Sequence, residues 1–266
     1  MNTPQSPTSI WHVVGASVAG TSHQQTGKEC EDAHDYRYHS NLLLLAAADG
    51  AGSASQAKAG STTAIEAVLS AAERILLQQR EPEHEDEWRS VLTLVLQAGR
   101  EALVKLATGG SSPAEQRPSE TLPLREFATT LLLVIATVHW VAVAQVGDGA
   151  IVIQHGDGRL ESLTPPEVRE YINETHFLTD DDYLIQTEYT ILSRAGLQGI
   201  ALLTDGLQRV AMKLPENIPH TPFFIPLFKF AAKPDAKEAE LRKFLEAERI
   251  NARTDDDKTL LLAVYQ

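Results

Sequence analysis

Residues 42–53 read LLLLAAADGAGS, and this stretch constrains the fold more than any other in the chain. The apolar run from Leu42 to Ala48 has no polar interruption and ends at Asp49-Gly50. A short apolar run that stops at a turn dipeptide is typical of a strand buried on both faces. The same arrangement recurs where the run from Ile200 ends at Asp205-Gly206. Two aspartates are therefore predicted at the ends of two buried strands, a place where catalytic groups often lie.

Helical spacing follows the first of these strands. Apolar residues recur at intervals of three and four from Lys58 onward and again over Trp88–Leu106, which predicts two amphipathic helices. The charged link 80–87 joins them, so an antiparallel pair is the simplest arrangement. A further helix is predicted over Pro234–Ile250. Four phenylalanines, at 223, 224, 228 and 230, could either dock a partner or form a buried helix face.

The most apolar stretch of the chain, Phe127–Val146, could be mistaken for a membrane span. His139 and Trp140 interrupt it, and its Thr, Val and Ile content is typical of strands. We therefore expect a buried β-hairpin, extended into a meander by strands over Ala150–His155 and Arg159–Leu163. A first strand is predicted over Ile10–Ala19 and a last apolar strand over Thr259–Tyr265.

This order of elements predicts an α+β fold, a four-layer αββα sandwich in which two antiparallel sheets lie between pairs of helices. Residues 1–266 are expected to form a single domain. A segment near 109–123 is rich in Gly, Ser and Pro and is expected to be a mobile surface loop. A polar, acidic segment near 164–188 is expected to be an inserted flap over the rim of the domain.

Composition limits the functional classes. The chain has 266 residues, of which 43% are hydrophobic and 22% charged, as expected of a globular protein. A net charge of -13 argues against a nucleic-acid partner and suits a site for divalent cations, although a solubilising surface explains most of the excess equally well. Cys30 is the only cysteine, so no intramolecular disulfide can form. The polar start of the sequence gives a cytoplasmic protein, with no membrane partner, as the default expectation.

Four acidic sites flank runs that should be buried: Glu31-Asp32, Asp49-Gly50, Asp205-Gly206 and Asp256-Asp257. Each Asp-Gly pair taken alone is weak evidence, because this dipeptide is a common turn signal. Several carboxylates that converge at the edge of a core repel one another unless a cation neutralises them. Oxygen donors of this kind are the ligands that Mg²⁺ and Mn²⁺ prefer.

The order and context of these sites resemble those of the type 2C metal-dependent protein serine/threonine phosphatases, also called the PPM family, over nearly the whole chain. GKECEDA and AAADGAGS are similar to the family's first two acidic motifs. FATTLLLVIAT and VAVAQVGDGAIVI resemble its central strands, and ALLTDGL and DDDKTLLLAV resemble its closing metal motifs.

The resemblance implies a set of ligands for two Mn²⁺ or Mg²⁺ ions: Glu31, Asp32, Asp49, Gly50, Asp205 and Asp256. In that set Asp49 would bridge both ions, Glu31 and the Gly50 carbonyl would hold one, and Asp205 and Asp256 the other. Asp32 would act through a water. Asp148 has the position that helps to hold a third, weaker ion in bacterial relatives, or it is simply a turn aspartate.

The implied chemistry is in-line attack on phosphorus by a hydroxide that bridges the metal ions, with Asp49 and Asp205 as the principal ligands. Several family residues are missing, as expected of a divergent, compact bacterial member. The phosphate-gripping arginine is replaced by Gly27, and the histidine after the first Asp-Gly, often assigned as proton donor, is Ala51. His23 and Lys28 are candidate phosphate contacts, and His23 is also a candidate catalytic residue. Alternatively, His23 is a loop histidine that bonds only to backbone.

The expected substrates are phosphorylated proteins in a signalling pathway, including a serine/threonine kinase or its own substrates. Two other functions stay open. The chain could be a pseudophosphatase that binds partners without hydrolysis, since Gly27 and Ala51 remove two usual helpers. It could also hydrolyse small phosphomonoesters, because the same two-metal attack works on any accessible phosphate.

Overall fold

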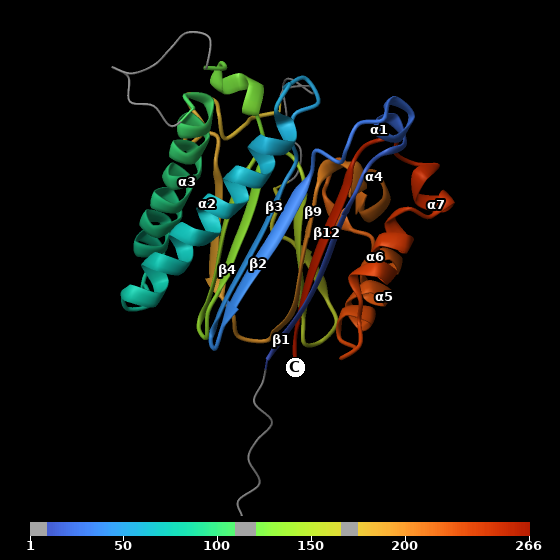
Figure 1. Cartoon of the computed structure of the whole chain (residues 1–266). Helices are drawn as coiled ribbons and strands as arrows, with labels where there is room; N and C mark the ends of the chain where they lie inside the picture. Colours follow the sequence, from blue (N-terminus) through green and yellow to red (C-terminus); the bar gives the residue numbers. More distant parts are fainter. Residues whose placement is uncertain (1–9, 110–120, 166–174) are drawn as a thin grey trace, which may run out of the picture.

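Two five-stranded antiparallel sheets lie face to face in the computed structural model, which describes residues 10–109, 121–165 and 175–266 (Figure 1). The first sheet has the strand order β1 (Trp11–Val18), β12 (Lys258–Tyr265), β9 (Leu197–Leu203), β6 (Ala150–His155) and β7 (Leu160–Ser162). The second has the order β2 (Ala33–His39), β3 (Leu42–Ala48), β4 (Leu131–Ala136), β5 (Trp140–Val146) and β8 (Glu188–Ser193). A short ribbon pairs β10 (Met212–Lys213) with β11 (Ile218–Pro219).

Helices cover the outer face of each sheet, which confirms the predicted α+β sandwich (Figure 1). The second sheet packs against α2 (Ala57–Gln78) and α3 (Glu85–Ala107), the predicted helix pair. The first sheet packs against a layer of shorter helices, namely α4 (Gln208–Ala211), α5 (Thr221–Ala231), α6 (Glu238–Leu245) and α7 (Glu248–Asn251). The remaining elements are α1 (Thr21–Thr26) and two 3-10 turns, η1 (Leu124–Phe127) and η2 (Asp205–Leu207).

The core has three apolar layers, and β3 shows why its sequence does not alternate. Leu42, Leu44, Ala46 and Ala48 pack toward α2 and α3, whereas Leu43, Leu45 and Ala47 pack between the two sheets. Because both faces of the strand are buried, every position is apolar. β12 has the same character, with Leu260 and Leu262 facing the helices and Leu261 and Ala263 facing the other sheet.

The predicted meander is wrong after Val146. β4 and β5 pair as the expected hairpin, but β6 crosses to the first sheet and pairs with β7 and β9. The crossing uses Gly147 and Gly149, whose φ angles of 87° and 114° suit glycine. The apolar pattern of β6 is compatible with a place in either sheet, so the pattern alone does not reveal the crossing.

Two predicted segments fall partly outside the described residues. Of the expected loop near 109–123, residues 110–120 are not described, and of the expected flap near 164–188, residues 166–174 are not described. The described part of the flap consists mostly of turns and is held to α3 by Arg100, which donates hydrogen bonds to the carbonyls of Leu178 and Asp180. No helix among the described residues has both the length and the apolar character needed to span a bilayer.

Candidate metal centre

The antiparallel pairing brings acidic residues from both sheets to one end of the sandwich. Ala33 pairs with Ala48, so Asp32, before β2, lies beside Asp49, after β3. In the first sheet Leu260 pairs with Leu203, so the segment before β12 lies beside the residues that follow β9. These segments carry Asp256 and Asp205.

Five of the predicted ligands gather here. Ligand oxygens of Asp49, Asp148 and Asp205 all lie within 4.8 Å of one another. Asp32 is fully buried and interacts directly with Asp49. Asp256 lies close enough for its charge to raise the pKa of both Asp49 and Asp205. The structure therefore brings together carboxylates that are far apart in the chain.

The electrostatics of this cluster suit a cation. Burial, together with the nearby charges of Asp148, Asp256 and Asp32, raises the pKa of Asp205 to about 7. Burial likewise raises the pKa of Asp32 to about 6 and that of Asp49 well above its ordinary value. In addition, Asp32 Oδ1 is buried without a hydrogen-bond partner. Clustered carboxylates with an unused buried oxygen are the donor set that a divalent cation would neutralise.

Four threonines fix the backbone and side chains of the cluster. The Thr130 hydroxyl accepts a hydrogen bond from the Asp49 N–H at 3.0 Å, and the Thr129 hydroxyl donates to the Asp49 carbonyl at 2.9 Å. Thr204 donates to Asp32 Oδ2 at 2.7 Å and accepts from the backbone N–H of Thr259 at 3.0 Å. Thr204 and Thr259 were not predicted as site residues. The only sequence signal was their position beside Asp205 and Asp257.

Glu31 lies apart from the three closest carboxylates. Its Oε2 is 3.6 Å from His23 Nε2, and its Oε1 is 3.6 Å from Lys28 Nζ. Oε2 is buried and has no hydrogen-bond partner. Both candidate phosphate contacts, His23 and Lys28, therefore lie beside Glu31.

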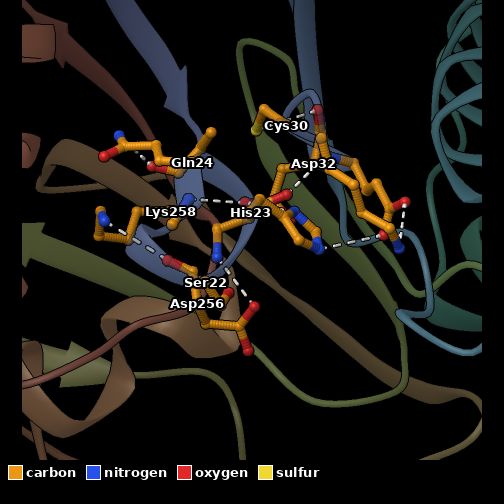
Figure 2. Close-up of polar contacts among 12 residues, drawn as sticks. Ser22, His23, Gln24, Cys30, Asp32, Asp256 and Lys258 are labelled. Carbon is orange, nitrogen blue, oxygen red and sulfur yellow. Dashed lines mark hydrogen bonds and ion pairs between the residues drawn. The ribbon is translucent and has the colours of Figure 1, made fainter. Parts of the chain in front are cut away.

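Asp257, which sequence analysis did not assign a role, joins α1 to the start of β12. Its Oδ1 accepts from the Gly20 N–H at 2.7 Å, and its Oδ2 accepts from the Glu31 N–H at 2.5 Å. His23 Nδ1 lies 3.0 Å from Oδ1 but outside hydrogen-bonding geometry. Figure 2 shows His23 of α1, Asp32 and the Asp256 turn gathered in one place.

Close backbone contacts and one left-handed conformation explain why glycine occupies three positions around the centre. A Cβ on Gly20 would lie 2.2 Å from the Asp255 carbonyl, and a Cβ on Gly50 would lie 2.6 Å from the Ala57 carbonyl. Gly27 ends α1 in the left-handed region, with φ 70°. A helix C-cap in this conformation favours residues without a Cβ. This accounts for glycine at position 27, where the family that the sequence resembles has an arginine.

A second group, which sequence analysis did not predict, consists of His176, Asp180 and Asp182 in the described part of the flap. Its ligand atoms also lie within 4.8 Å of one another. One oxygen of Asp180 already accepts from the Phe177 N–H, and one of Asp182 from the Gln186 amide. This group therefore offers fewer free oxygens than the cluster of Asp49, Asp148 and Asp205.

A family model and a curated relative both match most of the chain, and they agree with each other. The family model described as "Protein phosphatase 2C" matches residues 19–246. The chain is 35% identical to "Serine/threonine-protein phosphatase 3" of Escherichia coli (strain K12), over 96% of this chain and 98% of that protein.

Solved structures show the same fold at low sequence identity. A bacterial serine phosphatase matches with a TM-score of 0.64 and 16% identity, over 97% of this chain and 98% of that one. Stp1 from Staphylococcus aureus matches with a TM-score of 0.63 and 15% identity, over 97% and 96%. The catalytic domain of PstP, solved in complex with two manganese ions, matches with a TM-score of 0.57 and 17% identity, over 97% and 99%.

Proposed function

Because the chain belongs to the protein phosphatase 2C family and is a protein serine/threonine phosphatase, we propose that it acts through two divalent cations held by its clustered aspartates. The observation that carries this proposal is the meeting of Asp49, Asp148 and Asp205, each partly buried, within 4.8 Å of one another. The two manganese ions bound by the structurally similar PstP domain support it. We treat residues 1–266 as one catalytic domain, since the matched model and both sheets span most of the chain.

The proposed ligands combine the clustered aspartates with Glu31 and the Gly50 carbonyl, which the family resemblance implies. Asp49 interacts with both Asp32 and Asp205, so it is the residue that would contact both ions. Asp205 and Asp256 would hold one ion, and the Gly50 carbonyl and Glu31 the other. Asp148, which accepts a hydrogen bond from Thr175 Oγ1 at 2.7 Å, would hold a third ion. All of these donors are oxygens, which favours Mn²⁺ or Mg²⁺.

The bound ions would supply a water of lowered pKa for attack on phosphorus and positive charge to neutralise the phosphoryl oxygens. The residues of the chain orient and support this site. Thr204 holds Asp32, and Thr130 holds the backbone of Asp49. Ala51 is buried and has no proton to donate, so His23 is the proposed donor to the leaving oxygen. Lys28, half-exposed, is the proposed contact for the phosphate.

The proposed substrates are proteins phosphorylated on serine or threonine in the cytoplasm. A serine/threonine kinase, or the proteins that it phosphorylates, is the proposed partner in signalling. Nucleic acid is not a proposed partner, because the net charge of -13 would repel a phosphate backbone.

Phosphate release from a phosphothreonine peptide, measured with and without Mn²⁺, tests this function. Asp49→Asn removes the proposed bridging charge, so the rate with Mn²⁺ should fall about 100-fold or more. Asp235→Asn is the matched control, because Asp235 is exposed and outside the cluster, and it should keep full activity. If the wild-type protein releases no phosphate with Mn²⁺, the proposal fails. Faster turnover of p-nitrophenyl phosphate than of the peptide would instead indicate a small-phosphoester hydrolase.

A further inference from the structure

A cleft of about 640 Å³ opens in the helix layer that covers the first sheet. It lies between α5 and α6 and reaches residues of α4 and α7. Its volume is in the range of small-molecule sites, about 300–1,000 Å³. The residues of the carboxylate cluster do not line it. The lining residues that carry the argument are His220, Phe223, Phe230, Phe244, Arg249 and Arg253.

The walls of the cleft are apolar and well fixed. α5 divides its phenylalanines between two faces: Phe224 and Phe228 are buried against the first sheet, whereas Phe223 and Phe230 line the cleft. The ring of Phe223 lies 5.8 Å from that of Phe244 on α6. The group of phenylalanines singled out in the sequence therefore forms both a buried helix face and the wall of a binding-sized cleft.

Positive charge gathers at one end of the cleft. The Arg249 guanidinium lies 5.1 Å from the centre of the Phe244 ring. Within the described part of the chain, neither Arg249 nor Arg253 has a carboxylate within ion-pair distance, and both side chains line the cleft. Their guanidinium groups are therefore free to contact an anionic group in the cleft.

Glu240 of α6 is the one acidic residue of the lining among the described residues. Phe223, near the start of α5, contacts Phe244, near the end of α6. Glu240 is about one turn before Phe244, and Arg249 lies beyond it, on α7. The cleft therefore combines apolar side chains of α5 and α6 with two arginines, one on α7 and one just after it.

We propose that this cleft binds an amphiphilic anion, a small molecule whose apolar body lies between α5 and α6 and whose carboxylate or phosphate contacts Arg249 and Arg253. Arginine is the side chain best suited to hold such groups through paired hydrogen bonds.

Titration with 8-anilinonaphthalene-1-sulfonate, an apolar probe with one anionic group, tests the proposal in the full-length, Mn²⁺-loaded protein. We expect saturable binding of one probe per chain. Replacing both arginines (Arg249→Gln with Arg253→Gln) should weaken binding about tenfold or more, the effect of losing one charge-assisted contact. N-phenyl-1-naphthylamine, which lacks the sulfonate, should bind this variant and the wild type equally. The matched control is Arg209→Gln on α4, an exposed arginine outside the lining, which should leave both probes unaffected.

Displacement of the bound sulfonate probe separates the possible occupants. Decanoate should displace it at concentrations at which decanol does not. Probe binding that is not saturable, or that is equal in the wild type and the double variant, would overturn the proposal. Displacement by an acidic amphipathic peptide at a lower concentration than decanoate would also overturn it, in favour of a protein partner. Because the readout is binding, failure here leaves the proposed phosphatase chemistry untouched.

Discussion

At the scale of single residues, the fold holds Asp205 in an environment that disfavours its charge. Burial and neighbouring carboxylates raise its pKa to about 7 from an ordinary value of 3.8. An acid whose pKa is higher in the folded state stabilises the fold below its unfolded pKa, and this contribution is lost as the pH rises through the folded pKa. Without metal, the protein should therefore lose stability between about pH 4 and pH 7.

Asp205→Asn tests this, because asparagine keeps the shape and removes the titration. In EDTA, the melting temperature of the variant relative to the wild type should rise by several degrees between pH 5 and pH 8. Asp235→Asn, at an exposed position, should keep a constant difference over the same range. A constant difference for Asp205→Asn as well would show that Asp205 is not held neutral by the fold.

Asp257 is the residue for which a small change should matter most. Its two oxygens accept separately from Gly20 and Glu31, and an asparagine can offer only one oxygen in their place. Asp257→Asn should therefore leave one buried N–H without its acceptor and cost about 1–3 kcal/mol in unfolding free energy. Urea denaturation with excess Mn²⁺ measures it, and Asp255→Asn, two residues earlier and exposed, is the control. Equal midpoints for the two variants would contradict this role.

The sequence predicted some of these residues and not others for a physical reason. Asp49 and Asp205 are recognisable because each ends an apolar run. Thr204 is not, because its partner Asp32 is 172 positions away and the hydrogen bond exists only after the sheets pack. The orientation of Glu31 toward His23 and Lys28 is equally a product of tertiary structure.

At the scale of elements, the contact between α2 and η1 fixes the segment that supports Asp49. A Cβ on Gly60 of α2 would lie 2.3 Å from the carbonyl oxygen of Phe127, the last residue of η1. Phe127 is followed closely by Thr129 and Thr130, which bond to Asp49. Close approach of the two backbones, rather than helix propensity, therefore selects glycine at this position.

Gly60→Ala should destabilise the protein, although alanine is favoured over glycine in a helix by about 1 kcal/mol. We expect a net loss of about 1–3 kcal/mol from the steric conflict and a reduced rate of phosphate release, because Thr129 and Thr130 would shift. Thermal melting and the phosphopeptide assay measure both effects. Gly52→Ala, where a Cβ meets nothing within 4 Å, is the control. A more stable Gly60→Ala variant would show that the backbones separate at little cost.

Elements with a strong local pattern were predicted well. The run Leu42–Ala48 has the bounds of β3, and the two long helical patterns correspond to α2 and α3. The predicted meander was wrong because the chain crosses to the other sheet at Gly147 and Gly149. The apolar pattern of β6 does not show which sheet the strand joins. Local periodicity fixes the type of an element, whereas its neighbours are fixed by packing.

At the scale of the whole molecule, the proposed ligands come from both halves of the sandwich. Asp32 and Asp49 flank strands of the second sheet, and Asp205 and Asp256 flank strands of the first. Bound cations would therefore hold the two sheets together at the end where the carboxylates otherwise repel. The proposed activity and the global stability should depend on the same ions.

Excess Mn²⁺ should raise the melting temperature of the wild-type protein. A ligand at 100 times its dissociation constant stabilises the folded state by about 2.7 kcal/mol, which corresponds to a rise of roughly 5–11 °C for a chain of this size. Calorimetry with EDTA and then with excess Mn²⁺ measures the rise, and Asp235→Asn should show it in full. Asp49→Asn should lose most of it, because Asp49 is the proposed ligand of both ions. If Asp49→Asn keeps the full rise and Asp182→Asn loses it, the stabilising ion lies at the group formed by His176, Asp180 and Asp182, and the cluster around Asp49 is not the metal centre.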